Sequence, residues 1–310
     1  MRLRRFGVSV LLLVVLLAAA DYGVWRWGVW RLERGIGAWM AQMREAGWSV
    51  SAGHPQPGGW PLAAAVTLPD LFLSGGEADL PGGLTWSAER ATVSLRLLAP
   101  RVLQIEPGGR QRVQLAAWAD LPFTAETLRA TLPLPAEPPT LDATAAALRI
   151  GAPSSLTAVQ SFSLHLVLSA AATGFQAVAS GITLPQLGPQ LGSQSGQSWP
   201  LGAQVAAASV TGTITDGGTR PAETTDLAAR ATAWRDRGGR VDVQQFALRW
   251  GSLAVAGTAR LHLDRALQPA GQGEARLAGY APALDRMREA GILTAPTVAA
   301  AQAVLSLLAR

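Results

Sequence analysis

The chain has 310 residues, no cysteine, 26 basic and 21 acidic side chains, and a formal net charge of +5 at pH 7. Without cysteine it can form neither disulfides nor cysteine-ligated metal sites, so an exported domain depends on its apolar core for stability. Three basic residues lie at the N-terminus, and subtracting them from +5 leaves +2 spread along the chain, unlike the concentrated basic patch of a nucleic-acid-binding protein.

The N-terminus combines positive charge with an apolar run. Phe6–Ala20 is apolar throughout, and it follows three arginines, Arg2, Arg4 and Arg5. A membrane span needs about 20 residues, a length reached if the run continues to Trp25. Because a basic flank stays in the cytoplasm, we predict that residues 1–25 form a signal-anchor in the bacterial inner membrane and that the rest faces the periplasm. The alternative is a signal peptide cleaved after Ala20.

A predicted helix links this segment to the remainder. Trp25, Trp27 and Trp30 suit the outer membrane interface, where an indole buries its ring and keeps its N–H hydrated. Helical spacing continues over residues 26–47, which we expect to pack on the exported domain through Leu32, Ile36, Trp39, Met40 and Met43. Gly47 is the predicted end of this helix.

From residue 60 the apolar period changes from 3.6 to 2, which is typical of strands. The predicted strands cover residues 62–73 (interrupted at Pro69), 85–97, 102–106, 111–116, 127–134, 140–150, 156–169, 175–184, 204–214, 240–249, 252–264 and 271–279. Helices are predicted over residues 225–237, 282–290 and 297–309. The predicted fold is therefore mostly β, a long curved antiparallel sheet with a few packing helices in a domain over residues 48–310. A Gly/Ser/Gln-rich stretch at 186–202 is a candidate internal boundary.

Strand alternation predicts which side chains share a face. Over residues 85–97, Val93 and Leu95 fall on one face and Trp86 and Arg90 on the other. Other segments, such as residues 158–163 and 205–210, read as apolar on both faces. A sheet that is apolar on both faces must be covered on both, and one of the two faces can form a groove that a ligand covers.

The order of motifs resembles a known family. Gly47-Trp48 is followed by Gly58-Gly59-Trp60-Pro61-Leu62, which opens a strand ending Leu68-Pro69-Asp70-Leu71, and the strands 257–264 and 271–279 precede paired helices. This order, over nearly the full chain, is similar to the alphaproteobacterial family called domain of unknown function 2125, although that family's usual closing strand is absent here. The resemblance implies an anchored envelope protein without an assigned activity. The strand pattern is also loosely similar to AsmA-like envelope proteins, whose curved sheets are associated with lipid handling.

Chemistry-bearing motifs are not found. The histidines His54, His165 and His262 are far apart, no HExxH motif occurs, and the pair Asp285 and Glu289 reads as a solvated helix surface. We therefore predict no catalytic, metal or cofactor-binding residues and no enzymatic activity. The predicted function is a non-enzymatic inner-membrane protein that binds lipid or another amphipathic ligand along a sheet groove. The alternative is a scaffolding module of an envelope protein complex with no small ligand. No nucleic-acid partner is expected.

Overall fold

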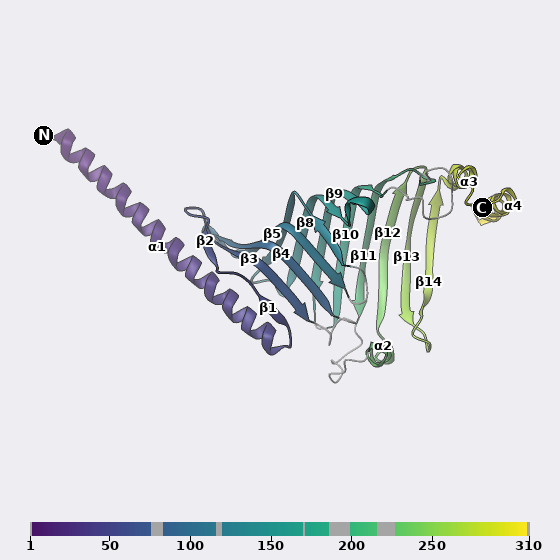
Figure 1. Cartoon of the computed structure of the whole chain (residues 1–310), viewed down its shortest axis with the longest axis horizontal. Helices are drawn as coiled ribbons and strands as arrows, with labels where there is room; N and C mark the ends of the chain where they lie inside the picture. Colours follow the sequence, from purple (N-terminus) through teal and green to yellow (C-terminus); the bar gives the residue numbers. More distant parts are fainter. Residues whose placement is uncertain are drawn as a thin grey trace. The chain divides into compact units, whose positions relative to one another are not determined.

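The structure is a computed structural model that describes residues 2–75, 83–115, 120–169, 171–185, 199–215 and 227–308 (Figure 1). Strand accounts for 54% of the chain and helix for 26%, which confirms the predicted class of antiparallel β structure with a few helices and an apolar N-terminal helix. The chain divides into two compact units. Unit 1 comprises Met1–Asp120 and Arg129–Ala136, and unit 2 comprises Leu121–Leu128 and Glu137–Arg310.

Unit 1 combines one long helix with a small antiparallel sheet. Its elements are α1 (Arg2–Glu45), β1 (Ser49–Ser51), β2 (Gln56–Gly58), β3 (Ala63–Gly75), β4 (Leu84–Arg96), β5 (Ala99–Leu115) and the part of β7 (Thr127–Pro133) that lies in this unit. Strands β1, β2 and β4 pair with β3, and β5 pairs with β4 and β7. The short strands β1 and β2 were not predicted, because three residues are too few to display a period.

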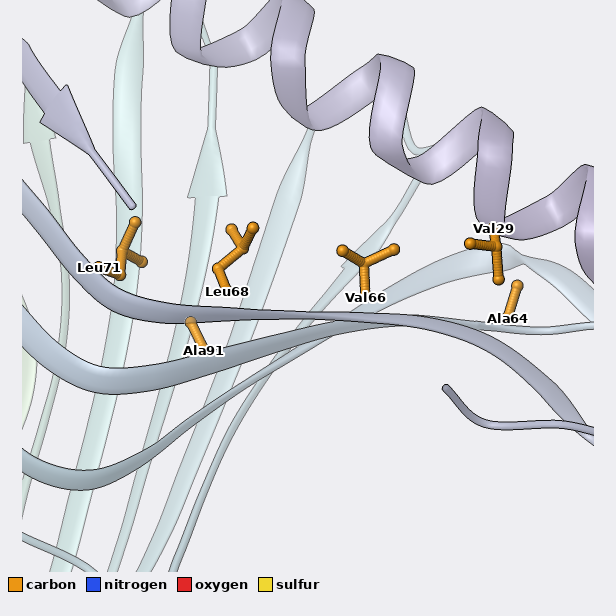
Figure 2. Close-up of a cluster of buried hydrophobic side chains, with 6 residues drawn as sticks. All are labelled: Val29, Ala64, Val66, Leu68, Leu71 and Ala91. Atoms are coloured by element: carbon orange, nitrogen blue, oxygen red, sulfur yellow. The ribbon is translucent and has the colours of Figure 1, made fainter. Parts of the chain in front are cut away.

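The second half of α1 lies on the sheet of unit 1, as predicted for the segment after the membrane span. Val29 is fully buried and packs with Ala64, Val66 and Leu68 of β3, and Figure 2 shows α1 running along that strand. The helix ends at Glu45 in a Schellman motif, in which Trp48 N–H bonds the Met43 carbonyl and Gly47 adopts φ +85°. The predicted stop at Gly47 is thus confirmed.

The packing stripe on α1 begins earlier than predicted and does not include Trp39. Leu32 and Ile36 contact the buried cluster as expected, but Trp25 and Val29 extend it toward the N-terminus. Trp39 is exposed and lies outside the stripe. Trp25, Val29, Leu32 and Ile36 are spaced by four, three and four residues, and a further step of three leads to Trp39. The exposure of Trp39 is therefore a departure from the helical spacing.

Strands β3 and β4 change phase part-way along, which corrects the predicted faces of residues 85–97. Ala88 and Ala91 are both buried although they are three residues apart, and the intervening Glu89 is exposed. The pairing of β4 with β5 shifts register between Ala88 and Arg90. An extra residue in one strand exchanges its two faces beyond that point. Trp86 therefore packs against the same cluster as Ala91, not on the opposite face.

The predicted turn at residues 107–109 is a bulge inside β5. Arg90 pairs with Gly108 and Ala91 with Pro107, so β5 is one strand where two were predicted. Gly109 adopts φ +78°, and a Cβ there would meet the Glu89 carboxylate. Gly and Pro together indicate a turn in most sequences, but here they accommodate the bulge opposite Glu89. Likewise β3 continues through Pro69, where an interruption was predicted, with Asp70 at φ 48°.

Unit 2 is a meander of antiparallel strands. Its strands are β6 (Leu121–Thr124), β8 (Thr140–Ile150), β9 (Thr157–Leu168), β10 (Ala172–Thr183), β11 (Gln204–Thr215), β12 (Arg240–Trp250), β13 (Leu253–Leu263) and β14 (Pro269–Ala278). From β8 onward each strand pairs with the next one along the chain. Seven of the eight were predicted to within three residues at each end; the short β6 was missed.

Helices and a short 3-10 turn complete unit 2. They are η1 (Pro153–Ser155), α2 (Leu227–Asp236), α3 (Tyr280–Glu289) and α4 (Ala295–Leu308), and the three α-helices match predicted helices. α2 ends in a Schellman motif at Gly238, as its Gly-Gly signal predicts. The candidate boundary at 186–202 stays a prediction, because residues 186–198 lie outside the described part of the chain.

Candidate functional site: an apolar sheet face and a membrane helix

The first half of α1 is apolar and exposed. Leu11–Leu17 all have more than half of their surface accessible, and the helix is long and apolar enough to cross a membrane by length and composition. Arg2, Arg4 and Arg5 lie in the first turns of this helix, but their side chains are outside the described part. The structure thus gives the predicted segment the form that a single-pass span requires.

The three predicted interface tryptophans divide into two kinds. Trp27 and Trp30 are exposed, and each has an arginine one turn further along, with Arg31 and Arg34 guanidinium carbons 5.6 and 4.2 Å from the ring centres. Trp25 instead faces the protein, where its indole Nε1 donates a hydrogen bond of 3.0 Å to the carbonyl of Gly58. Trp25 therefore fixes α1 to unit 1, while Trp27 and Trp30 remain available to a membrane interface.

One face of the unit 2 sheet is apolar across seven strands. Directly paired residues point to the same face, and the pairings give three consecutive rows. The rows are Ala145, Phe162, Ala179, Ala208, Leu248, Val255 and Leu277; Ala143, Leu164, Ala177, Val210, Phe246, Gly257 and Ala275; and Leu141, Leu166, Phe175, Gly212, Val243, Ala259 and Gly273. We call these 21 positions the apolar face. It contains no polar side chain.

Two aromatic rings on this face reach over glycines of the neighbouring strands. A Cβ added to Gly212 would meet Cζ of Phe175 at 2.8 Å, and one added to Gly257 would meet Cζ of Phe246 at 2.9 Å. Each phenylalanine therefore covers the glycine of the neighbouring strand. Glycine suits these positions because the ring approaches the backbone closely there. The two rings and the two glycines therefore lie together in the middle of the apolar face.

The opposite face of the same strands is more polar, which corrects the expectation that these strands are apolar on both sides. One of its rows is Asp142, His165, Gln176, Thr211 and Gln245, and the row of Thr144, Ser163 and Ser209 also contains Val178, Ala247 and Ala256. Ser161 and Ser180 share a hydrogen bond of 2.6 Å. Part of the earlier expectation came from residues 158–163, where a buried Val159 and a half-buried Phe162 are separated by exposed Gln160 and Ser161. A phase change there, next to Gly181 at φ +60°, puts both apolar residues on one side.

Helices of unit 2 lie at the strand ends, and between them the apolar face is half exposed. Arg235 of α2 donates to the carbonyls of Asp264 and Arg265, in the turn after β13. α3 begins after Gly279, whose Cα lies against the carbonyl of Ser252 in the turn before β13. Within the described part of unit 2, only α2 and α3 show notable helix-to-strand contact, both with β13. Most of the 21 positions are only half-buried.

An aromatic cluster closes one end of the strands. Trp199 and Trp250 meet edge to face with ring centres 5.8 Å apart, and their indole N–H groups bond the carbonyls of Pro185 and Gly202 at 2.7 Å each. Leu201 between them is almost fully buried. These bonds satisfy the polar edge of each indole, as buried tryptophan requires. Trp199 and Trp250 therefore form a fixed aromatic cluster at this end of the strands.

The chain matches one family model over nearly all of the two units. That family is described as "Uncharacterized protein conserved in bacteria (DUF2125)", and the match covers residues 25–310. The chain belongs to this family. No curated protein and no solved structure matches the chain. The DUF2125 match begins at Trp25, the residue at which α1 first bonds unit 1, so the family region coincides with the part of the chain that packs. The similarity to AsmA-like proteins stays a prediction.

The polar face of this DUF2125 member carries an ion-pair cluster. Asp242 accepts from Nε of Arg260 at 2.6 Å and from Nε of Arg240 at 2.8 Å. Hydrogen bonds first from Arg260 and then from Arg240 hold the pKa of Asp242 below its ordinary value. Asp242 and Arg260 border an open polar depression of about 760 Å³ that Gln272 and Glu274 also line. These solvated pairs orient β12 and β13 but contribute little to stability.

The histidines are dispersed, as the sequence indicates. His54 and His262 are exposed, and His165 on β9 lies 2.6 Å from the Asp142 carboxylate on β8. In the part of the chain that the structure describes, no group of three or more His, Cys, Asp or Glu side chains is placed to hold a metal ion. Asp285 contacts Arg288 at 3.9 Å on the surface of α3, in keeping with the predicted solvated helix.

Proposed function

We propose that this protein is held in the inner membrane by α1, places both units in the periplasm, and binds an acyl chain of a lipid or another amphipathic ligand along the apolar face. In this proposal its role is binding, without catalysis. The observation that carries it is the apolar face itself, 21 positions in three rows with no polar side chain. Soluble proteins rarely leave so broad an apolar surface to water.

The dimensions and energetics favour an acyl chain. Seven strands about 4.8 Å apart span roughly 29 Å. An acyl chain spans one leaflet, about half of a hydrocarbon core that is roughly 30 Å thick, so it fits within the apolar face. Each methylene moved from water onto an apolar surface gains about 0.8 kcal/mol. The rings of Phe175 and Phe246 lie over glycines of the neighbouring strands, and such an apolar surface suits a flexible chain lying along the rows.

A contrast between the two units supports the same proposal. In unit 1 the apolar side of β3 is covered by α1, and Val29, Ala64 and Val66 are fully buried there. In unit 2 the corresponding rows are mostly half-buried, and the described helices α2 and α3 stand at the strand ends. A sheet face left open between two end helices has room for a ligand in the place that α1 takes in unit 1.

Adjacent residues of β11 give a matched test. Val210 lies on the apolar face and Ser209 on the polar face of the same strand. We would purify the full-length protein, Val210→Glu and Ser209→Glu in the same mild detergent and compare bound lipid by native mass spectrometry. The wild type and Ser209→Glu should carry lipid, and Val210→Glu should lose it while keeping its circular dichroism spectrum.

A second variant keeps the test decisive if Val210→Glu does not fold. Leu277 lies on the same face but on the exposed strand β14, with 43% of its surface accessible, so Leu277→Glu should fold and bind less lipid. Arg276→Glu, one residue away on the polar face, is its control. A wild type free of lipid, or equal lipid in the Val210 and Ser209 variants, would refute the proposal.

The alternative is a scaffolding role within an envelope protein complex. The observation that favours it is β14, which pairs only with β13 among the described strands and is exposed at nine of its ten positions. An open strand edge can receive a strand from another protein. A lipid-free protein that co-purifies with one defined partner, and loses it on Gln272→Pro in β14, would favour this role over lipid binding.

A further inference from the structure

Four exposed apolar side chains gather in the turns at one end of the unit 1 sheet. They are Trp60 and Leu62 before β3, Leu98 between β4 and β5, and Leu134 after β7, and we call them the turn patch. Leu62 and Leu98 are exposed by 74% and 94%, values unusual for leucine in a folded protein. The turns are neighbours, because Leu97 N–H bonds the carbonyl of Leu62 at 3.2 Å and Leu134 N–H bonds that of Arg101 at 2.8 Å.

These turns lie beside residues 25–28 of α1. The Trp25 indole bonds Gly58, two residues before Trp60. The Cα of Gly28 lies against Ala64 at the start of β3 and near the Leu97 side chain. The opposite end of the sheet lies near the end of α1, where Trp48 packs against Gly75. Strand β3 therefore runs along α1 away from the N-terminus, and the turn patch is level with residues 25–28.

That level is where a membrane span starting at Phe6 would end. The 20 residues from Phe6 to Trp25 are separated by 19 steps of about 1.5 Å, which gives roughly 28 Å. A hydrocarbon core is about 30 Å thick. The exposed residues Leu11–Leu17 occupy the middle of this length. The turn patch, held rigidly at residues 25–28, would then meet the outer boundary of the bilayer.

We propose that the turn patch is a second membrane contact, in which Trp60, Leu62, Leu98 and Leu134 enter the interfacial layer of the bilayer that α1 crosses. This inference rests on the proposed membrane attachment of α1. Leucine and tryptophan side chains gain free energy on leaving water for that layer, and an indole suits it best. Arg96 and Arg101 flank the turns and are exposed, so they can pair with anionic headgroups. Two contacts would fix the tilt of unit 1 on the membrane.

Site-directed spin labelling can test the contact, and the absence of cysteine makes single labels straightforward. The full-length chain with Leu62→Cys or Leu98→Cys would be reconstituted in vesicles of phosphatidylethanolamine and phosphatidylglycerol. Collisions of the nitroxide with oxygen and with a water-soluble nickel complex report its depth. Leu13→Cys in the span is the positive control. Gln114→Cys, exposed at the far end of β5, is the aqueous control.

The expected result is an ordered series of nickel accessibility. Gln114 should be highest, Leu62 and Leu98 several-fold lower, and Leu13 lowest. Leu62 and Leu98 as accessible as Gln114, with Leu13 protected, would overturn this inference and leave the membrane anchor standing. A water-accessible Leu13 would overturn the anchor and this inference together.

Discussion

Gly28 of α1 and Ala64 of β3 lie so close that a Cβ on Gly28 would come within 2.9 Å of the Ala64 Cβ. This is a close contact between the helix and the strand that it covers, and both residues are buried. Small residues at such a crossing let the backbone elements approach closely. The contact therefore sets the distance of α1 from the sheet.

Enlarging Gly28 should separate α1 from β3. We expect Gly28→Leu to destabilise unit 1 by about 1–3 kcal/mol, the usual cost of overpacking a close contact. Thermal unfolding of the detergent-solubilised protein, followed by circular dichroism, measures the change. Gly35→Leu is the control, because a Cβ there meets nothing within 4 Å and replacing glycine improves helix propensity. Equal losses in both variants would mean that the Gly28 contact does not hold the helix.

Two neighbouring residues of β4 test the faces of unit 1. Val93 is buried opposite Val66, while Thr92 points to the other face and shares a hydrogen bond of 3.0 Å with the Thr67 hydroxyl. Val93→Asp should cost roughly 3–5 kcal/mol, as an unpaired buried charge does, and prevent folding of unit 1. Thr92→Asp should cost about 1 kcal/mol, the value of one hydrogen bond. Soluble yield and urea unfolding distinguish the two, and equal behaviour would show that the register is wrong.

Much of the fold could be predicted from the local pattern of the sequence. The strands β8 to β14 have alternating apolar residues and clear turn signals, and their positions follow from period alone. The glycine stops at Gly47 and Gly238 could be predicted because each follows a stretch of helical spacing, and both adopt a positive φ. The apolar segment Phe6–Ala20 could be predicted from its composition alone.

What could not be predicted is the phase of the faces. A bulge depends on the pairing of two strands, so it cannot be predicted from Glu89 or Gly109 taken singly. For this reason Trp86 was assigned to the wrong face, and the one-sided apolar face of unit 2 appeared two-sided. The turn patch was missed for a similar reason. Isolated leucines such as Leu62 and Leu98 are ordinary in a sequence, and only the pairing of the strands brings their turns together.

The ion pairs of Asp242 predict a pH dependence. Because Arg260 and Arg240 lower the pKa of Asp242 in the folded state, the carboxylate stabilises unit 2 above its ordinary pKa of about 4. That contribution is lost as pH falls through the lowered pKa. The melting temperature of Asp242→Asn should thus be slightly lower than that of the wild type at pH 7 and converge with it below about pH 4. Asp285→Asn, which removes only a long contact to Arg288, should track the wild type throughout; a constant gap for Asp242→Asn would contradict the electrostatic cause.

We predict that the N-terminal half of α1 is required for export of the units. Alkaline phosphatase folds only outside the cytoplasm, so its fusion after Arg310 should be active, and the same fusion to a chain lacking residues 1–20 should be inactive. Removing residues 1–20 leaves the contacts of Trp25 and Val29 with unit 1 in place. Lost activity would therefore reflect lost export instead of a damaged domain, which a protease-resistance assay of both fusions verifies.

The same cells distinguish an anchor from a cleaved signal. If α1 is retained, the protein should stay in the membrane after a carbonate wash and its first residue should be Met1 or Arg2. Cleavage after Ala20 would give a protein that begins at Asp21 and washes off, unless the turn patch alone can hold it. That exception is improbable on energetic grounds, since a few interfacial side chains bind a bilayer reversibly while a spanning helix is effectively permanent. An inactive full-length fusion would refute export itself, and with it the periplasmic placement of both units.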